Sequence, residues 1–357
     1  MEKQRIAILF GGNSSEYEVS CLSGAAVAEG LAELGHTVHK IGITKAGRWF
    51  LYTGQTENMR DGSWEQDPTC LPAFISPDTG THGIVCNRGG KLETIELDVV
   101  FPVLHGRNGE DGTVQGLLEL AEIPYVGCGV LASAMCMDKA AANTVFDAEG
   151  IPHAPWLALT RRQTEDFAAV LRTVKEKLHY PIFVKPAVGG SSVGITKVKT
   201  DKELQEALAL AALHDDKIVF EQGISGQEVE CAVLGNQTLF SSLPGEIESC
   251  NEVYDYEAKY QSGGASKLFL PAKLPQHKLE EVRDLALRAY AALGCTGLSR
   301  VDFFVEHGTE KVMISEINTL PGFTSISMYA KLMEMSGVTF AELLTKLLAL
   351  ALERANR

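Results

Sequence analysis

The 357-residue sequence lacks a long hydrophobic run and an excess of basic residues. No stretch reaches the ~18 consecutive apolar residues that a membrane-spanning helix needs. The first apolar run, residues 6–10, ends at two glycines and is too short for a signal sequence. Lys and Arg number 32 against 46 Asp and Glu, so the formal net charge is −14. Because such a surface repels nucleic-acid backbone and anionic lipid, we expect no nucleic-acid or membrane partner.

The eight cysteines include no CxxC pair, and the chain is too long to need disulfides for stability. They are predicted to be free buried thiols in a reducing compartment, so we expect a cytoplasmic protein. Hydrophobic residues make up 45%, charged residues 22% and aromatic residues 7% of the chain. These values exclude collagenous, coiled-coil and largely disordered classes.

The length predicts two or three domains. Apolar runs and helical periodicity predict an opening α/β unit with strands at 6–10, 37–43 and 97–104 and helices at 18–34 and 112–120. Further on, they predict helices at 133–149, 201–214, 276–293 and 339–353 and a strand at 218–221. We place three domains at 1–127, 128–226 and 227–357, and the fold class is α/β and α+β.

A glycine-rich segment, Gly189-Gly190-Ser191-Ser192, follows an apolar strand and Lys185. Glycines allow close approach and positive φ, so the segment can offer backbone N–H groups and hydroxyls to an anion. It is not GxxxxGK[ST], which disfavours a P-loop fold. The alternative to an anion loop is a flexible hairpin with a solvated lysine.

Two strand-like runs, residues 299–305 and 312–318, flank a predicted turn at 307–309. If they pair as a hairpin, Asp302 faces Glu316 and Arg300 faces Asn318, with all four side chains on one side of the sheet. Opposed carboxylates repel each other unless a cation compensates. Two carboxylates and an amide oxygen are suited to Mg²⁺. The alternative is a solvated face on which Arg300 pairs with the acids.

Other polar segments are also candidate sites. The Pro321-Gly322 turn leaves backbone N–H groups near the acidic hairpin, where an oxyanion can be held. Residues 11–16 and 104–112 follow apolar strands, whose carboxyl ends favour ligand sites. Alternatively, the polar residues of the first segment cap a helix, and His105 is a buried, hydrogen-bonded histidine. An anion loop, a lysine and a Mg²⁺ face together suggest nucleoside triphosphate chemistry.

Seven motifs stand in a characteristic order: GGNSSEYEVS at 11–20, LHGRNGEDGTVQG at 104–116, MDK at 137–139, FVKP to GGSSVG at 183–194, YDYEAKY at 254–260, SRVD at 299–302 and EINTLPGFTS at 316–325. Over nearly the whole chain they resemble D-alanine:D-alanine ligase, of the ATP-grasp superfamily. The resemblance implies a three-domain ATP-grasp ligase with an N-terminal Rossmann-like parallel sheet. ATP would lie between the central and C-terminal ATP-grasp domains.

The resemblance also implies the cofactors, ATP and two Mg²⁺ ions that Mn²⁺ can replace. Phosphates would be held by two lysines and a closing loop, and the adenine and ribose by two glutamates. These residues are Lys139 and Lys185, then Gly190, Ser191, Ser192 and Val193, then Glu221 and Glu228. The metal ligands implied are Asp302, Glu316 and Asn318, the residues that the hairpin pairing proposes independently. Val188-Gly189 departs from the more polar residues of several relatives.

The resemblance implies the substrate-binding residues as well. Glu16, with His105 nearby, would hold the first D-alanine, and Glu16, Ser191 and Tyr260 would form a hydrogen-bonded set. The remaining ones are Lys259 and Ser327 for the second substrate's carboxylate, Met328 beside them, and Arg300 with the Gly322 amide as oxyanion donors. Several ligases that use D-serine or D-lactate have arginine at the position of Met328.

The implied activity is ATP-dependent joining of two D-alanines through D-alanyl phosphate, for peptidoglycan precursor synthesis. The small-molecule partners are therefore D-alanine and ATP, and we expect a homodimer. One alternative is a D-alanine:D-serine or D-lactate ligase of the vancomycin-resistance type. Another is a non-catalytic ATP-binding regulator on the same fold, which the filled catalytic positions disfavour.

Overall fold

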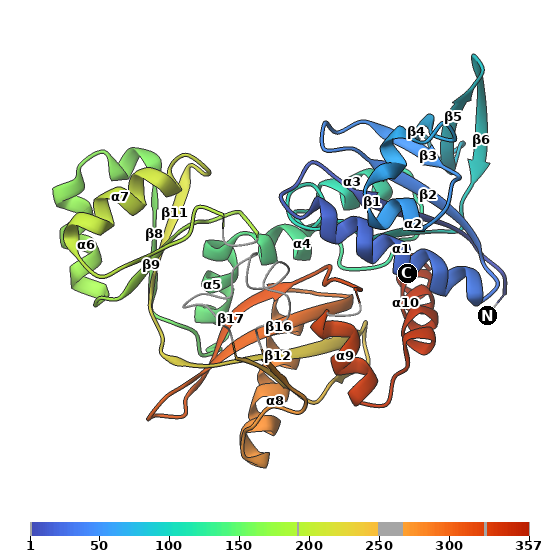
Figure 1. Cartoon of the computed structure of the whole chain (residues 1–357). Helices are drawn as coiled ribbons and strands as arrows, with labels where there is room; N and C mark the ends of the chain where they lie inside the picture. The colour runs from blue at the N-terminus through green and yellow to red at the C-terminus, as the bar shows by residue number, and fades with distance from the viewer. Residues whose placement is uncertain (1, 191–192, 249–266, 325–326, 357) are drawn as a thin grey trace.

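The computed structural model of the chain describes residues 2–190, 193–248, 267–324 and 327–356. Within these residues the strands form three sheets, of seven, four and six strands (Figure 1). The sheets span residues 5–102, 156–222 and 226–318. This combination of α/β and α+β units is the predicted fold class. The predicted domain limits fall at or between the sheets, and the division into domains stays a prediction.

The N-terminal sheet has the strand order β6-β5-β4-β3-β2-β1-β7. Its strands are β1 Arg5–Gly11, β2 Thr37–Ile43, β3 Trp49–Tyr52, β4 Leu71–Ile75, β5 Gly83–Arg88, β6 Lys91–Glu96 and β7 Val99–Pro102. Only β2, β1 and β7 pair in parallel, and β3 to β6 extend the sheet antiparallel. The parallel strands and helices α1 (Tyr17–Glu33) and α3 (Thr113–Leu120) match the predicted elements. The short helix α2 (Glu57–Arg60) and strands β3 to β6 lie where the sequence predicted no element.

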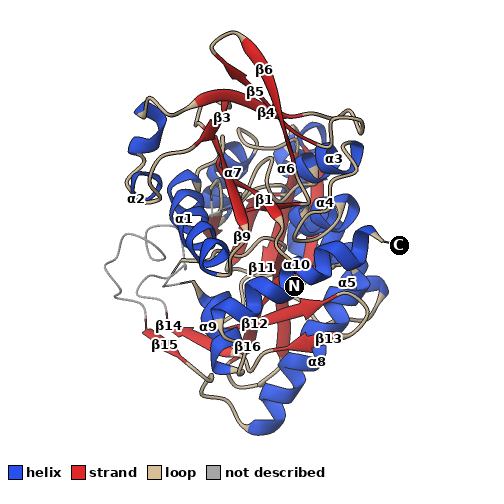
Figure 2. Cartoon of the chain, turned by 90° about the vertical axis from the view of Figure 1, so that its right-hand side faces the viewer, coloured by secondary structure: helices blue, strands red, loops and turns tan. Residues whose placement is uncertain are grey.

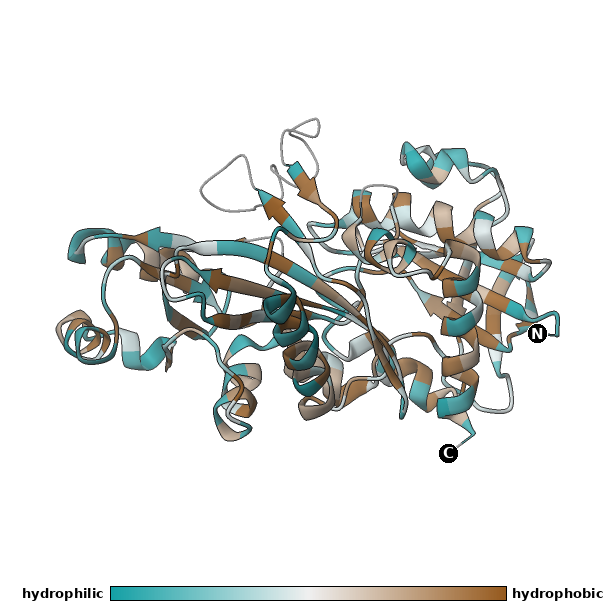
Figure 3. Cartoon of the chain, turned by 90° about the horizontal axis from the view of Figure 1, so that it is seen from below, coloured by the Kyte–Doolittle hydropathy of each residue, from teal (hydrophilic) through white to brown (hydrophobic). Residues whose placement is uncertain are grey.

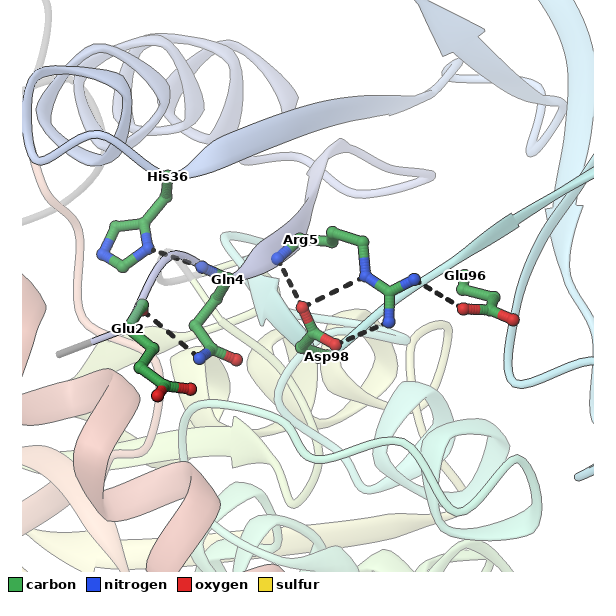
Figure 4. Close-up of polar contacts among 6 residues, drawn as sticks. All are labelled: Glu2, Gln4, Arg5, His36, Glu96 and Asp98. Atoms are coloured by element: carbon green, nitrogen blue, oxygen red, sulfur yellow. Dashed lines mark hydrogen bonds and ion pairs between the residues drawn. The ribbon is translucent and has the colours of Figure 1, made fainter.

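A polar cluster closes the amino end of β1, away from the glycines that end the strand (Figure 4). Arg5 donates to both oxygens of Asp98, from Nε at 3.2 Å and Nη2 at 2.7 Å, and pairs with Glu96 at 2.6 Å. Hydrogen bonding to Arg5 lowers the pKa of Asp98. The Gln4 N–H donates to Nδ1 of His36 at 3.2 Å. These contacts hold the start of β1 beside the start of β7. Because the two strands are parallel, their carboxyl ends lie at the same edge of the N-terminal sheet.

The central sheet is antiparallel, with the order β10-β9-β11-β8. Its elements are β8 Trp156–Thr160, α6 Phe167–Lys177, β9 Ile182–Pro186, β10 Thr196–Val198, α7 Asp201–Ala211 and β11 Lys217–Gln222. Both helices pack their apolar residues on one face of the sheet around the buried Phe220. On the other face, Ala140 packs against Val219, and Lys185 and Glu221 line a cavity.

The single helix predicted over residues 133–149 is wrong. The structure has two helices, α4 (Val130–Met137) and α5 (Lys139–Ala148), separated at Asp138, whose backbone is extended. The Asp138 carboxylate caps α5 by accepting from the N–H groups of Ala140 and Ala141 at 3.0 and 3.1 Å. Because aspartate at this position satisfies free N–H groups at a helix start, a new helix begins there. The break turns Lys139 toward the glycine-rich loop.

The third sheet is antiparallel and has the order β15-β14-β12-β16-β17, with β13 also paired to β12. Its strands are β12 Gly226–Gly235, β13 Leu239–Ser241, β14 Gly245–Glu248, β15 Lys267–Phe269, β16 Gly297–Glu306 and β17 Val312–Asn318. Helices α8 (Gln276–Ala292), α9 (Met328–Met335) and α10 (Phe340–Ala355) complete the unit. The predicted pairing of β16 with β17 is confirmed: Arg300 faces Asn318 and Asp302 faces Glu316, until a bulge after Asp302.

One core joins the two ends of the chain. Apolar residues of β1, β7 and α1 pack with α9 and α10, and α9 lies beside β12 (Figure 2). Hydrophobic residues run along the central strands, while the helices alternate hydrophobic and hydrophilic faces (Figure 3). α1 approaches α10 so closely that a Cβ at Gly30 would lie 2.6 Å from Leu344. The N-terminal sheet is therefore seated on the C-terminal helices.

No single helix in the described ranges is both long and apolar enough to cross a membrane. α9 and α10 reach that length only as a pair bent by 104°.

Candidate active site

A cavity of about 560 Å³ lies between the central sheet and the C-terminal sheet. The sequence-predicted residues that line it are Lys139, Lys185, Glu221, Glu228, Asp302 and Glu316. Apolar walls come from both sheets, with Phe183 on one side and Phe304 and Met313 on the other. A cavity with apolar walls and a few convergent charges is typical of a small-molecule site.

The two lysines reach the cavity from the central unit. Lys139, on the first turn of α5, donates from Nζ to the Gly189 carbonyl at 2.9 Å. Lys185 of β9 forms an ion pair with Glu221 of β11, and both side chains are largely buried. The Asn143 amide lies 3.5 Å from the same carboxylate. Glu221 therefore holds the Lys185 ammonium inside the cavity, where the charge is only partly exposed to solvent.

The glycine-rich loop meets the N-terminal unit at Glu16. A Cβ atom on Gly190 would lie 2.9 Å from Oε2 of Glu16, so an alanine there would require this carboxylate to shift. The start of the loop is fixed by the Val188 N–H, which donates to Asp215 at 2.8 Å. The Val193 N–H donates to the Gly190 carbonyl at 3.2 Å. The start of the loop and Glu16 thus lie close together.

The acidic face is larger than predicted, because a third strand contributes to it. Asp302 of β16 is flanked by Glu316 on β17 and by Glu230 on β12, as direct cross-strand partners. Arg300 binds both Asp302 oxygens, at 2.7 and 2.6 Å, and lies 3.0 Å from Glu230. The Asn318 amide donates to Asp302 at 2.9 Å.

The carboxylates of this face change the pKa of Arg300. Burial alone would lower the pKa of Arg300, but the carboxylates of Asp302 and Glu230 raise it well above its usual value. The face thus combines three acidic side chains with one guanidinium. Within the described residues, no group of three His, Cys, Asp or Glu side chains has the arrangement of a metal site. Glu230 was missed, although it alternates with Glu228 on β12 and so shares its face.

On the N-terminal side, Glu16 and His105 follow the carboxyl ends of β1 and β7. His105 is 5% exposed, and burial lowers its pKa, so the ring is neutral at pH 7. Since its Nδ1 contacts the Leu320 carbonyl at 2.9 Å, Nδ1 carries the proton. Nε2 is then an acceptor, and it is buried with no partner in the part of the chain that the structure describes. It can accept a hydrogen bond from a ligand.

The sequence analysis quoted Glu110 only as part of a motif, but it connects two loops of the site. Its carboxylate accepts from the Gly106 N–H at 2.9 Å and from the Leu320 N–H at 3.1 Å. Burial, with the nearby Glu16 carboxylate, raises the pKa of Glu110 to about 8. The contact with Leu320 spans 210 residues, so no local sequence signal could have found it.

The remaining predicted residues lie around the loop after β17. Ser327 accepts from the Thr324 N–H at 3.0 Å, and a Cβ on Gly322 would lie 2.8 Å from its hydroxyl. Met328 is 5% exposed and belongs to the core shared with α1, so the structure does not bring it to the cavity. Four predicted residues lie outside the described ones: Ser191, Ser192, Lys259 and Tyr260.

Comparison with known proteins agrees with this geometry. The family models described as the N-terminus and C-terminus of D-ala D-ala ligase match residues 5–128 and 145–349. A D-alanine–D-alanine ligase of Thermoanaerobacter sp. (strain X514) is 48% identical over 356 residues, which cover 100% of this chain and 98% of that protein. The enzyme of the same name from Caldicellulosiruptor bescii is 49% identical over 357 residues, covering 99% and 96%.

Solved structures are similar over the same extent. The VanG D-Ala:D-Ser ligase from Enterococcus faecalis has a TM-score of 0.89 and 40% identity, covering 98% of this chain and all of that one. The D-alanine-D-alanine ligase from Coxiella burnetii has a TM-score of 0.85 and 35% identity, covering 100% and 96%. With both family models matched and near-complete coverage at 48% identity, the chain belongs to the D-alanine–D-alanine ligase family.

Proposed function

We propose that the protein joins two D-alanines to D-alanyl-D-alanine, using ATP and passing through D-alanyl phosphate, for peptidoglycan precursor synthesis. The observation that carries the proposal is the cavity between the two sheets, where two lysines face a row of carboxylates. Family membership supplies the reaction class, an ATP-dependent ligase.

In this proposal the nucleotide occupies the cavity. Lys139 and Lys185 bind phosphate oxygens, together with the loop from Gly190 through Ser191 and Ser192 to Val193. A phosphate would replace the Gly189 carbonyl as the partner of Lys139. Glu221 and Glu228, which also line the cavity, contact the adenine side and the ribose.

The donor set of the acidic face fits Mg²⁺, with Mn²⁺ as a replacement. Asp302 and Glu316 provide carboxylate oxygens and Asn318 an amide oxygen, the hard ligands that Mg²⁺ prefers. Two ions would be held by these three residues. When bound, Mg²⁺ would neutralise charge on the transferring phosphoryl group.

The substrates would lie between the cavity and the N-terminal sheet. Glu16 holds the ammonium of the first D-alanine. The carboxylate of this D-alanine attacks the γ-phosphorus of ATP, the bond to the bridging oxygen breaks, and ADP leaves as D-alanyl phosphate forms. The amine of the second D-alanine, placed by Lys259 and Ser327, loses a proton and attacks the acyl phosphate, and inorganic phosphate leaves. Arg300 and the Gly322 N–H donate to the tetrahedral oxyanion; removing one such donor typically costs ~10²–10³ in rate.

Acyl phosphates hydrolyse, so water must be excluded while the intermediate exists. The set predicted from Glu16, Ser191 and Tyr260 would close the site. Gly190 supports this, because it already lies against Glu16.

A D-alanine:D-serine ligase is the second candidate, because VanG is among the similar structures. The two functions differ in the second substrate only. Met328 in place of arginine favours D-alanine, although its side chain lies in the core.

The finer properties of the protein are proposals too. We propose a cytoplasmic homodimer, and the free thiols support a reducing compartment: the seven cysteines that the structure describes form no disulfide. Sedimentation of the purified protein tests the dimer.

The direct test of the catalytic proposal is phosphate release from ATP with Mg²⁺, with and without D-alanine. We expect release only when D-alanine is present. ATP binding without D-alanine-dependent release would favour a non-catalytic regulator.

A further inference from the structure

Three hydrogen bonds tie the N-terminal unit to residues 320–323 of the C-terminal unit. The Leu320 carbonyl accepts from His105 at 2.9 Å, and the Leu320 N–H donates to Glu110 at 3.1 Å. The Phe323 N–H donates to the Ser23 hydroxyl of α1 at 3.1 Å. Gly322 lies between these anchors, and we call residues 320–323 the amide loop.

The anchors leave the amide loop little freedom. Leu320 and Phe323 are 3% and 4% exposed, and the Phe323 ring packs edge-on against Phe101 at 5.7 Å. Gly322 itself is half-buried, and its Cα lies close enough to Ser23 that a Cβ would be 3.6 Å from the hydroxyl. The backbone is therefore held on both sides of Gly322, by Glu110 at Leu320 and by Ser23 at Phe323.

Glu110 is suited to this role by its chemistry. One carboxyl oxygen accepts from the amide loop and the other from Gly106, so the side chain joins the two loops that border the site. Both oxygens of a carboxyl group have lone pairs, whereas the nitrogen of a glutamine amide has none to offer. Glutamine at this position would therefore lose one of the two bonds without a change in size.

We infer that Ser23 and Glu110 are positioning residues of the ligase reaction, which hold the amide loop so that the Gly322 N–H faces the reacting carbonyl. The inference rests on the proposed function, because it assigns the Gly322 N–H to the oxyanion. Neither residue needs to touch substrate. Placement matters at this scale, since a displacement of ~1 Å at a reacting centre can cost ~10² in rate.

The test uses two variants and two matched controls in the full chain. Ser23→Ala removes the acceptor for Phe323, and Glu110→Gln breaks one of the two bonds of Glu110. Asp111→Asn is the control for the second, because Asp111 also accepts two backbone N–H bonds, but both come from its own loop, at 2.8 and 3.0 Å. Ser336→Ala is the control for the first, since Ser336 accepts from the Leu243 N–H at 2.9 Å, away from the amide loop.

We expect both test variants to lower kcat by ~10- to 100-fold while the KM for ATP changes by less than about 2-fold. The controls should keep kcat within about 2-fold of the wild type. A purely structural role would lower the folded fraction and leave kcat per folded molecule unchanged. If wild-type protein releases phosphate with D-alanine but both test variants keep kcat within about 2-fold of the wild type, the inference is overturned and the proposed function stands. Wild-type protein without D-alanine-dependent turnover would overturn the proposed function together with the inference.

Discussion

Arg300 is a positive side chain that lies directly on the row of three carboxylates. Its side chain is 15% exposed, and those of Glu230 and Asp302 are 7% and 16% exposed, so solvent screens these charges weakly. Removing one partner of a buried ion pair typically costs ~3–5 kcal/mol, because the remaining charge stays buried. We therefore expect Arg300→Met to lower the free energy of unfolding by ~3–5 kcal/mol.

The assay is urea unfolding of the purified variants, with and without Mg²⁺. Arg161→Met is the matched control, since Arg161 pairs with Asp216 at 3.7 Å on the surface and should cost only ~0–1 kcal/mol. Adding Glu230→Gln to Arg300→Met should restore part of the loss by removing one repelling charge. Mg²⁺ should stabilise the Arg300 variant more than the wild type. An Arg300→Met protein as stable as the Arg161 control would refute this account of the acidic face.

Three further predictions concern single residues. Glu316→Ala should nearly abolish turnover and leave the circular dichroism spectrum unchanged; near-normal turnover would contradict its role as a metal ligand. Gly190→Ala should slow turnover, because its Cβ would lie 2.9 Å from Glu16, and steady-state kinetics unaffected by the change would disprove that contact. Since the pKa of Glu110 is raised to about 8, the folded protein favours its protonated form, and its contribution to stability is lost as the pH rises from about 4.5 through 8. The unfolding free energy of wild type minus Glu110→Gln should therefore fall between pH 6 and pH 9 in urea titrations, and an equal difference at both values would refute the shift.

The acidic hairpin could be predicted from the sequence because strand side chains alternate and the two apolar runs flank a predicted turn. The predicted partners of Arg300 and Asp302 are the observed ones. The bulge lies between these pairs and the turn, where Phe303 faces Ile314, one residue away from the partner that the predicted register gives. Glu230 shows where such reasoning stops, because its place beside Asp302 depends on how β12 docks against β16.

Long-range contacts explain the other features that the sequence analysis did not predict. Asp138 interrupts a helical pattern because its carboxylate caps α5 while the next residue, Lys139, donates its backbone N–H to the Ala187 carbonyl at 2.9 Å. The hydrophobic periodicity continues across Asp138, so it predicted a single helix. Ser23 and Glu110 carry ordinary local signals, a helix serine and a loop carboxylate, and only the docking of the N-terminal unit on the amide loop makes them part of the site.

The most direct test of the whole account is analysis of the product. Purified protein would be given ATP, Mg²⁺ and equal amounts of D-alanine, D-serine and D-lactate at neutral pH, and the products separated by mass spectrometry. We predict D-alanyl-D-alanine as the main product, formed together with one phosphate per bond. A mixed dipeptide or a depsipeptide as the main product would contradict the assignment.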